Sequence, residues 1–295
     1  MLFLTPYPVF YNSKIMAKMK FPSRPHTTQN SHGLNIKPQG TIIIIAMDIL
    51  TVVGIVGGLV ALLVGAILKG ASILFLIQPA AFVIVVPTTL FASLVVMPLS
   101  KFSLIIEGLK MAFKGGGNEM LEVKNQLVEL ANLVRKEGML ALETKAEEIE
   151  DPFLRRAIDL MVLGVDENVL VESLEAEIAK KEEDFEIAVE YWKNSAESAP
   201  TFGLVGAVFG LMKALKSLDN AQELAHGISS AFVATVYGIT FSYLVFGPLS
   251  KKIKIKSKEE ILKMYMVLDA CRMMVRGENP RLIEERLSSY IEVKG

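Results

Sequence analysis

The chain has 295 residues, of which 52% are hydrophobic and 21% are charged, and its formal net charge is -1. Its mean hydropathy of +0.42 is too high for an ordinary soluble domain, and the near-neutral charge gives no argument for nucleic-acid binding. A single cysteine, Cys271, excludes an internal disulfide framework and a cysteine-based zinc site, and the three histidines lack metal-ligand spacing. The apolar residues occur in blocks, because residues 101–199 alone hold 22 acidic and 12 basic side chains.

Residues 1–46 form a basic extension without any acidic residue ahead of the first long apolar block. A targeting peptide is one interpretation, but no small-residue cleavage pattern precedes the block. A disordered basic tail on the cytoplasmic face is a second interpretation. We favour a third, in which Met47 is the natural start of the protein.

Residues 47–100 predict a hairpin of two membrane spans. The stretch Ile49–Leu68 is uncharged and long enough to cross a hydrocarbon core of about 30 Å. A short turn at Lys69-Gly70 leads to a second uncharged run over residues 71–99, which is too long for a straight span. Bends are expected at the prolines of this run, because each removes a backbone donor: Pro79, Pro87 and Pro98.

Residues 101–199 predict a helical, highly charged soluble domain. The apolar positions from Phe102 to Phe113 recur at helical spacing and are expected to extend the second span into water. Further helices are expected over residues 118–148, from Asp151-Pro152 onward, and over residues 167–198. No phosphate loop, nucleophile elbow or HExxH motif occurs, so the carboxylates predict a solvated face, and the chain is not expected to be an enzyme.

Residues 200–249 predict the third and fourth spans. Pro200 is expected to open the third span in its first helical turn, and Gly206 and Gly210 have the spacing that allows close helix packing. The fourth span, Ile228–Leu249, has 22 residues without a charge, which reach about 33 Å as a helix.

Residues 250–295 predict an amphipathic helical tail with a break near Pro280. Five lysines follow the fourth span between residues 251 and 258, and this excess of positive charge indicates that both termini are cytoplasmic. The predicted fold is therefore all-α: a polytopic membrane protein with four transmembrane helices and a large helical cytoplasmic domain.

The predicted spans lack the charged residues that carry ions through membranes. Residues 49–99, 201–212 and 228–249 contain no carboxylate, histidine or arginine. Either the chain moves no ion, or a partner helix supplies a carboxylate. Thr235 is the foremost candidate for a path-lining residue, although its hydroxyl can also bond back to a carbonyl one turn earlier.

The fourth span carries a resemblance to a known family. From Ala231 it reads A-F-V-A-T-V-Y-G-I-T, then seven residues, then Pro248. This resembles the pattern of the MotA/PomA family, A-[LMF]-x-[GAT]-T-[LIVMF]-x-G-x-[LIVMF] followed by seven residues and proline, and only Thr240 departs from it. The opening from Met47 to Gly58 is also similar to the start of that family, so the resemblance covers the chain from Met47 onward.

The resemblance implies a stator subunit of the bacterial flagellar motor, located in the inner membrane. The family forms a pentameric ring around a MotB/PomB-like single-span partner, which carries the ion-binding aspartate, and no cofactor is implied besides the translocated H⁺ or Na⁺. Thr235 matches the threonine that faces this aspartate. Pro200 and Pro248 match the prolines expected to bend spans three and four as the aspartate changes charge.

Arg135 and Glu143 match the charged pair through which the family engages the rotor protein FliG. On one continuous helix, eight residues correspond to an 80° turn, so both side chains are expected to face the same partner.

Ala207 bears on the identity of the ion. Sodium-type members carry a hydroxyl residue at this position and proton-type members usually carry alanine, which favours protons, whereas Thr240 adds an oxygen that can compensate. The sequence also allows two alternative functions. An ExbB/TolQ-like energiser of outer-membrane processes would have three spans and not the hairpin. A non-conducting membrane scaffold would not need Thr235, Thr240 and two boundary prolines, and the lack of any catalytic constellation argues against a membrane-bound enzyme.

Overall fold

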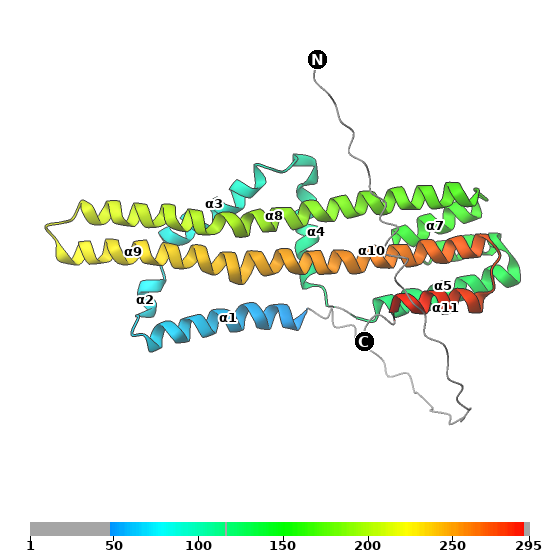
Figure 1. Cartoon of the computed structure of the whole chain (residues 1–295), viewed down its shortest axis with the longest axis horizontal. Coiled ribbons are helices and arrows are strands. Elements are labelled where there is room, and N and C mark those ends of the chain that lie inside the picture. Colours follow the sequence, from blue (N-terminus) through cyan, green and yellow to red (C-terminus); the bar gives the residue numbers. More distant parts are fainter. Residues whose placement is uncertain (1–47, 116, 292–295) are drawn as a thin grey trace, which may run out of the picture. The chain divides into compact units, whose positions relative to one another are not determined.

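The computed structural model describes residues 48–115 and 117–291, and every regular element within these ranges is helical (Figure 1). The predicted extension, residues 1–46, lies outside the described residues. The elements in chain order are α1 (Ile49–Leu68), α2 (Ile73–Leu76), α3 (Pro79–Leu94), the 3₁₀ helix η2 (Leu99–Lys101), α4 (Phe102–Phe113), α5 (Glu119–Glu137), the 3₁₀ helix η3 (Met139–Ala141), α6 (Leu142–Ala146), α7 (Pro152–Val162), α8 (Glu167–Leu215), α9 (Ala221–Thr240), the π-helix η4 (Phe241–Phe246), α10 (Gly247–Val275) and α11 (Pro280–Ile291).

Four membrane-competent helical segments confirm the predicted fold class. They are long and apolar enough to cross a membrane: Ile49–Leu68, Ile73–Leu94, Glu167–Leu215 and Ala221–Val275. The two longer segments also contain charged residues that belong to the helical domain, so only a part of each is apolar.

The first span, α1, is attached to the remainder of the chain at its beginning. The Asp48 side chain caps α1 by accepting a hydrogen bond from the Thr51 N–H at 3.4 Å. The same carboxylate forms an ion pair with Lys252 of α10, and the Asp48 N–H donates to the Phe113 carbonyl at 3.0 Å. None of the α1 residues is buried by the chain itself.

The second span is broken, as the prolines predicted. The helix α2 ends at Leu76, and α3 begins with Pro79 at its first position and keeps Pro87 inside it. The break leaves the Leu76 carbonyl without a helical donor, and the Tyr237 hydroxyl of α9 donates to it at 2.5 Å. A distant side chain therefore satisfies a backbone group that lipid could not satisfy.

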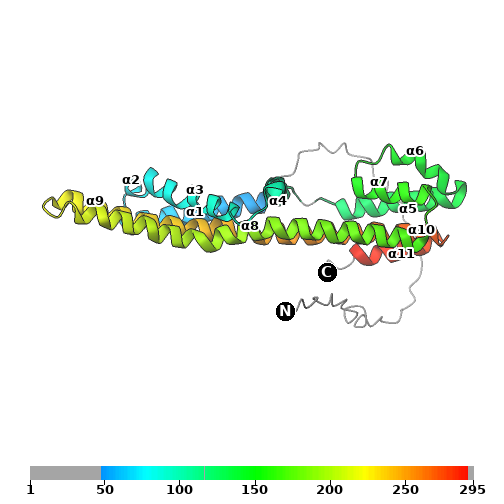
Figure 2. The same ribbon diagram turned by 90° about the horizontal axis from the view of Figure 1, so that it is seen from above.

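The prediction that Phe102–Phe113 continues the second span is wrong. The chain turns after α3 ends at Leu94, and α4 runs across α8 and α10 instead of along them (Figure 1, Figure 2). Ion pairs of Lys101 with Asp184 and of Glu107 with Lys181 hold α4 on α8. The apolar residues have helical spacing both before and after the turn between α3 and α4, so the sequence pattern does not reveal this turn.

The prediction of one helix over residues 118–148 is also wrong. Gly138 ends α5 with a φ of 85°, a conformation that favours glycine, and η3 and α6 follow. Three apolar residues of this stretch, Leu127, Leu130 and Leu142, are nevertheless buried in one core, whereas Leu121 is 40% exposed.

Pro200 does not open a helix, contrary to the prediction. It lies inside α8, which runs without interruption for 49 residues, or about 74 Å. Hence the predicted acidic helix and the third span are one element. Buried hydroxyls join α8 to α3, with Ser195 Oγ 2.9 Å from Ser93 Oγ and the Tyr191 hydroxyl 3.2 Å from the Leu90 carbonyl oxygen.

The helical domain has a core of its own, built from segments that lie far apart in the sequence. Side chains of α5, α6 and α7 pack there with the beginning of α8, the end of α10 and α11. Asp151 caps α7 by accepting from the N–H groups of Phe153 and Leu154, and Pro152 occupies the first helical position as expected. The C-terminal segment thus packs into the same core as α5–α7.

Cys271 is fully buried in this core, and burial raises the pKa of its thiol to about 12. Because the thiolate is the reactive form, we expect a maleimide to leave the native protein unlabelled at about pH 8 and to label it once it is unfolded. Mass spectrometry before and after denaturation measures this directly. Rapid labelling under native conditions would contradict the packing described for the end of α10.

Candidate functional site

Helices α8 and α9 are packed backbone to backbone, and glycines make this approach possible. A Cβ atom added to Gly238 would lie 2.7 Å from the Ala199 carbonyl oxygen, and one added to Gly210 would lie 2.7 Å from the Ala231 nitrogen. Nearer the beginning of α9, a Cβ on Gly227 would lie 2.8 Å from the Ala214 Cα. The small residues of the predicted third span therefore serve the close packing that their spacing indicated.

This packing brings Ala207 and Thr235 to the same level of the helix pair. A Cβ on Gly206 would lie 2.8 Å from the Ala234 Cβ, and Ala207 and Thr235 are the next residues on each helix. Ala207 is buried, whereas Thr235 is half-buried. The Thr235 hydroxyl donates to the Ala231 carbonyl at 3.2 Å, the back-bonded arrangement that membrane threonines often adopt.

Thr240 occupies the last position of α9, directly before the π-helix η4. It is half-buried, and no hydrogen bond of its hydroxyl joins it to another described residue. Five residues, more than one helical turn, separate it from Thr235. The two threonines therefore lie on one helix, but of their two hydroxyls only that of Thr235 has a hydrogen-bond partner among the described residues.

Pro200 lies at the contact of α8 with α9, and Pro248 stands at the start of α10. A Cβ on Gly238 would lie 3.1 Å from the Pro200 Cα, so Pro200 faces α9 closely. Pro248 is exposed and stands in the first turn of α10, directly after η4. Proline lacks the N–H that would donate to the carbonyl four residues earlier, and the helix ahead of Pro248 widens to the π form, in which the Gly247 N–H bonds to the Ser242 carbonyl.

Arg135 and Glu143 are exposed but do not share a helix. Arg135 stands in the last turn of α5, Glu143 in the first turn of α6, and the turn at Gly138 lies between them. The 80° argument from a single helix is therefore wrong, because the chain changes direction between the two residues. Arg135 reaches the carbonyl of Gly277, just past the end of α10, at 3.4 Å. Leu140, which sequence reasoning did not single out, is 71% exposed at the same turn.

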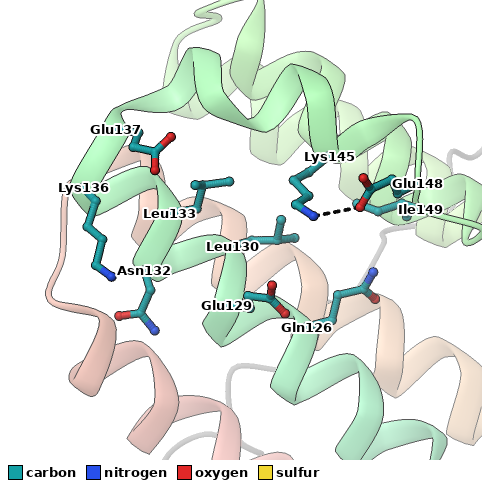
Figure 3. A pocket seen from close by; sticks show the side chains of 10 residues that line it. All are labelled: Gln126, Glu129, Leu130, Asn132, Leu133, Lys136, Glu137, Lys145, Glu148 and Ile149. Atoms are coloured by element: carbon teal, nitrogen blue, oxygen red, sulfur yellow. Dashed lines mark hydrogen bonds and ion pairs between the residues drawn. The ribbon is translucent and has the colours of Figure 1, made fainter.

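A groove of about 390 Å³ lies between α5 and α6, next to this turn (Figure 3). Its more buried lining is apolar, with Leu130 and Ile149, and its exposed lining carries both signs of charge. Lys145 is held within it by an ion pair with Glu148 at 2.8 Å. The charged residues that line the groove are Glu129, Lys136, Glu137, Lys145 and Glu148.

Glu167, at the start of α8, ties that helix to the end of α10. Its carboxylate accepts hydrogen bonds from the Arg272 Nε at 2.8 Å and from an Arg276 Nη at 2.6 Å. The two guanidinium groups lower the pKa of the Glu167 carboxyl from 4.5 to about 2, with the Arg276 hydrogen bonds as the larger cause. Sequence reasoning missed this tie because the partners are about a hundred residues apart.

The Glu167 ion pairs predict an acid-sensitive contribution to stability. A carboxyl with a lowered pKa stabilises the fold above its unfolded-state pKa and loses that effect as the pH falls through the folded-state value. We expect Glu167→Gln to lower the unfolding temperature of the full chain at neutral pH, with a difference from wild type that shrinks below about pH 4.5 toward pH 2. Glu175→Gln, at an exposed position of α8, is the matched control. A difference that stays constant down to pH 3 would rule out this role.

Comparisons with known proteins agree with this architecture. Residues 145–266 match the MotA/TolQ/ExbB proton channel family. Motility protein A of Helicobacter pylori is 40% identical over 245 residues, which are 83% of this chain and 95% of that protein. Among solved structures, MotAB of C. jejuni matches with a TM-score of 0.78 and 38% identity, covering 83% of this chain and 96% of that one. The flagellar MotAB stator complex of Bacillus subtilis matches with a TM-score of 0.73 and 31% identity, covering 83% and 98%.

The predicted resemblance is confirmed by these similarities, which extend over nearly the full length of the relatives. Sequence identity and fold agree, and the four membrane-competent segments occur in the order that the sequence predicted. The chain belongs to the MotA/PomA family, within the MotA/TolQ/ExbB proton channel family.

Proposed function

We propose that the chain is the ring-forming subunit of a flagellar stator, which binds a MotB-like single-span partner and uses ion flow to generate torque on the rotor. The observation that carries this proposal is the similarity over nearly the full length of Motility protein A and of solved MotAB stator structures. Residues 49–99, 201–212 and 228–249, all of which are described, contain no carboxylate, histidine or arginine. A conducting complex must obtain its titratable group from elsewhere, and a partner helix with an aspartate supplies it.

The α8–α9 pair is the proposed wall of the ion path. Its glycine contacts fix Ala207 and Thr235 at one level, and Thr235 is only half-buried by the chain itself. A hydroxyl that bonds back to its own helix still has lone pairs with which to accept a hydrogen bond from a hydrated ion or from a protonated aspartate. Ala207 adds no oxygen, which favours protons over sodium as the translocated ion.

The membrane orientation follows from charge. Five lysines between residues 251 and 258 begin directly after the apolar part of the fourth span, and this excess of positive charge supports a proposed topology with the helical domain and both termini in the cytoplasm. One elementary charge that crosses about 100 mV releases about 2.3 kcal/mol, which is the proposed energy source for each step.

Torque is proposed to leave the complex at the turn between α5 and α6. Arg135 and Glu143 stand on either side of it, both exposed, and opposite charges suit the steering of a charged rotor surface such as FliG. The exposed Leu140 adds an apolar contact between them. The groove that adjoins the turn carries both signs of charge and belongs to the same proposed surface.

A ring of identical subunits, pentameric by analogy with the family, accounts for the exposed apolar surface of the first span. None of the α1 residues is buried within the chain, and a Cβ added to Gly54 or Gly65 would meet no atom of another element within 4 Å. Neighbouring subunits and lipid are the proposed cover for this surface.

Complementation tests the proposed function. The full chain and a MotB-like partner are produced in a bacterium whose own stator genes are deleted, and rotation of tethered cells is recorded. We expect rotation with both proteins and none with either alone. If both proteins reach the membrane as a complex and no rotation occurs, the proposal fails, and an ExbB/TolQ-like role in outer-membrane processes is preferred.

A further inference from the structure

The carbonyl of Ala196 in α8 lacks its ordinary helical donor. In an α-helix the N–H of residue 200 would donate to it, but residue 200 is a proline and has no N–H. An unpaired backbone carbonyl in an apolar layer is costly, and membrane proteins satisfy such groups internally. The continuity of α8 through Pro200 therefore requires a substitute donor.

Ser242 supplies this donor. Its Oγ donates to the Ala196 carbonyl at 2.6 Å, and its side chain is only 5% exposed. The two residues are 46 positions apart, so the bond joins α8 to η4. No other side chain among the described residues is seen to donate to this carbonyl.

Ser242 lies in the π-helical segment that directly precedes the turn with the second proline. Pro248 removes the donor for the carbonyl four residues earlier, and residues 241–246 adopt the π form. Ser242 lies within that segment, and its own carbonyl accepts from the Gly247 N–H. The hydroxyl of Ser242 thus bonds to the Ala196 carbonyl, which Pro200 leaves without its helical donor, from within the π-helical segment ahead of Pro248.

Ser250 provides a contrast on the same pair of elements. Its Oγ donates to the Val189 carbonyl of α8 at 3.0 Å, and its side chain is 6% exposed. The helical donor to the Val189 carbonyl is the N–H of residue 193, which is a lysine and therefore has this N–H. The Ser250 bond is therefore an additional one, whereas the Ser242 bond replaces a missing one.

We propose that Ser242 is a positioning residue whose hydroxyl replaces the N–H that Pro200 lacks and so holds α8 against η4 at the level of both prolines. The hydrogen bond between Ser242 and Ala196 does not depend on the proposed function. The consequence of this bond for rotation rests on the proposed function. If the prolines bend the helices during each step, the bond sets how far α8 and η4 can shift relative to each other.

A cycle of variants in the full chain tests the bond through thermal unfolding in detergent. Ser242→Ala leaves a buried carbonyl unpaired and is expected to lower the midpoint by on the order of 5 °C. Ser250→Ala removes an equally buried hydroxyl and is expected to cost less than half of that shift. In a Pro200→Ala background, residue 200 regains its N–H, and Ser242→Ala is expected to cost no more than Ser250→Ala.

Two outcomes of this cycle would overturn the proposal: equal losses from Ser242→Ala in both backgrounds, or equal losses from Ser242→Ala and Ser250→Ala. If Ser242→Ala does not fold, Ser242→Thr and Ser242→Val replace it, since they share a shape and differ in the hydroxyl. The threonine variant is then expected to be more stable than the valine variant only when Pro200 is present, and equal stability would contradict the bond.

Rotation of tethered cells tests the functional part. With a MotB-like partner, we expect Ser242→Ala to slow rotation at least severalfold, and Ser242→Thr and Ser250→Ala to rotate like the unaltered chain. Full-speed rotation of Ser242→Ala would overturn the positioning role. Failure of the unaltered chain to rotate would instead count against the proposed function, so the two failures are distinguishable.

Discussion

Gly238→Ala is expected to separate α8 from α9 and to be among the most destabilising single-methyl changes in the chain. The added Cβ would lie 2.7 Å from the Ala199 carbonyl oxygen and 2.9 Å from the Gly203 Cα. Both are backbone atoms, so no side-chain rotation can relieve the contact. Glycine to alanine in a helix gains about 1 kcal/mol in propensity, but overpacking against backbone costs on the order of 3 kcal/mol, so the net effect is destabilising.

The matched control for this change is Gly54→Ala in α1, where an added Cβ meets nothing within 4 Å. Its expected effect on the unfolding temperature of the full chain, measured without neighbouring subunits, is neutral or slightly stabilising. Gly210→Ala, whose Cβ would lie 2.7 Å from the Ala231 nitrogen, is expected to behave like Gly238→Ala. Equal stability of the Gly238 and Gly54 variants would show that the backbone contact of α8 and α9 is not as described.

Thr235→Val is expected to slow rotation by at least about tenfold without a large loss of stability. Valine keeps the shape of threonine and removes only the hydroxyl, which bonds to the Ala231 carbonyl at 3.2 Å. A hydrogen bond to a charged group is worth about 1.5–3 kcal/mol, and each 1.4 kcal/mol in a barrier changes a rate about tenfold. The rotation rate of tethered cells, at a load low enough for ion transfer to limit speed, is the measurement.

Thr89→Val in α3 is the control for the loss of a back-bonded hydroxyl. Its Oγ1 donates to the Val85 carbonyl at 2.6 Å, as Thr235 does to Ala231, but Thr89 is fully buried between helices of the same chain. It is expected to leave the speed of the assembled complex unchanged. If the two variants slow rotation equally, Thr235 acts through helix packing and has no part in the ion path.

The four spans were predictable because length and apolar composition are local properties of the sequence. The break at Pro79, the caps at Asp151 and Pro152, and the close packing allowed by Gly206 and Gly210 follow from rules of the same kind. The fourth-span motif also identified the family, because it fixes the spacing of several residue types at once.

Features that depend on distant partners were not predictable in this way. A proline ordinarily marks the start of a helix or a break in it, whereas α8 runs through Pro200, and Ser242 donates to the carbonyl of Ala196, 46 residues earlier, that Pro200 leaves without its helical donor. The turn at Gly138 was missed because a lone glycine in a periodic pattern is often tolerated within a helix. This turn changes the predicted rotor contact most, since it places Arg135 and Glu143 on different helices.

The most direct test of the central claim is the rotation speed of cells that depend on this chain and a MotB-like partner, recorded at varied sodium concentration and fixed pH, with and without a protonophore. The structure carries alanine at position 207, and we expect a speed that is indifferent to sodium and abolished by the protonophore. A speed that follows sodium would contradict proton coupling and make Thr235 or Thr240 the compensating oxygen ligand. Rotation that persists when both ion gradients are removed would contradict ion-driven torque itself.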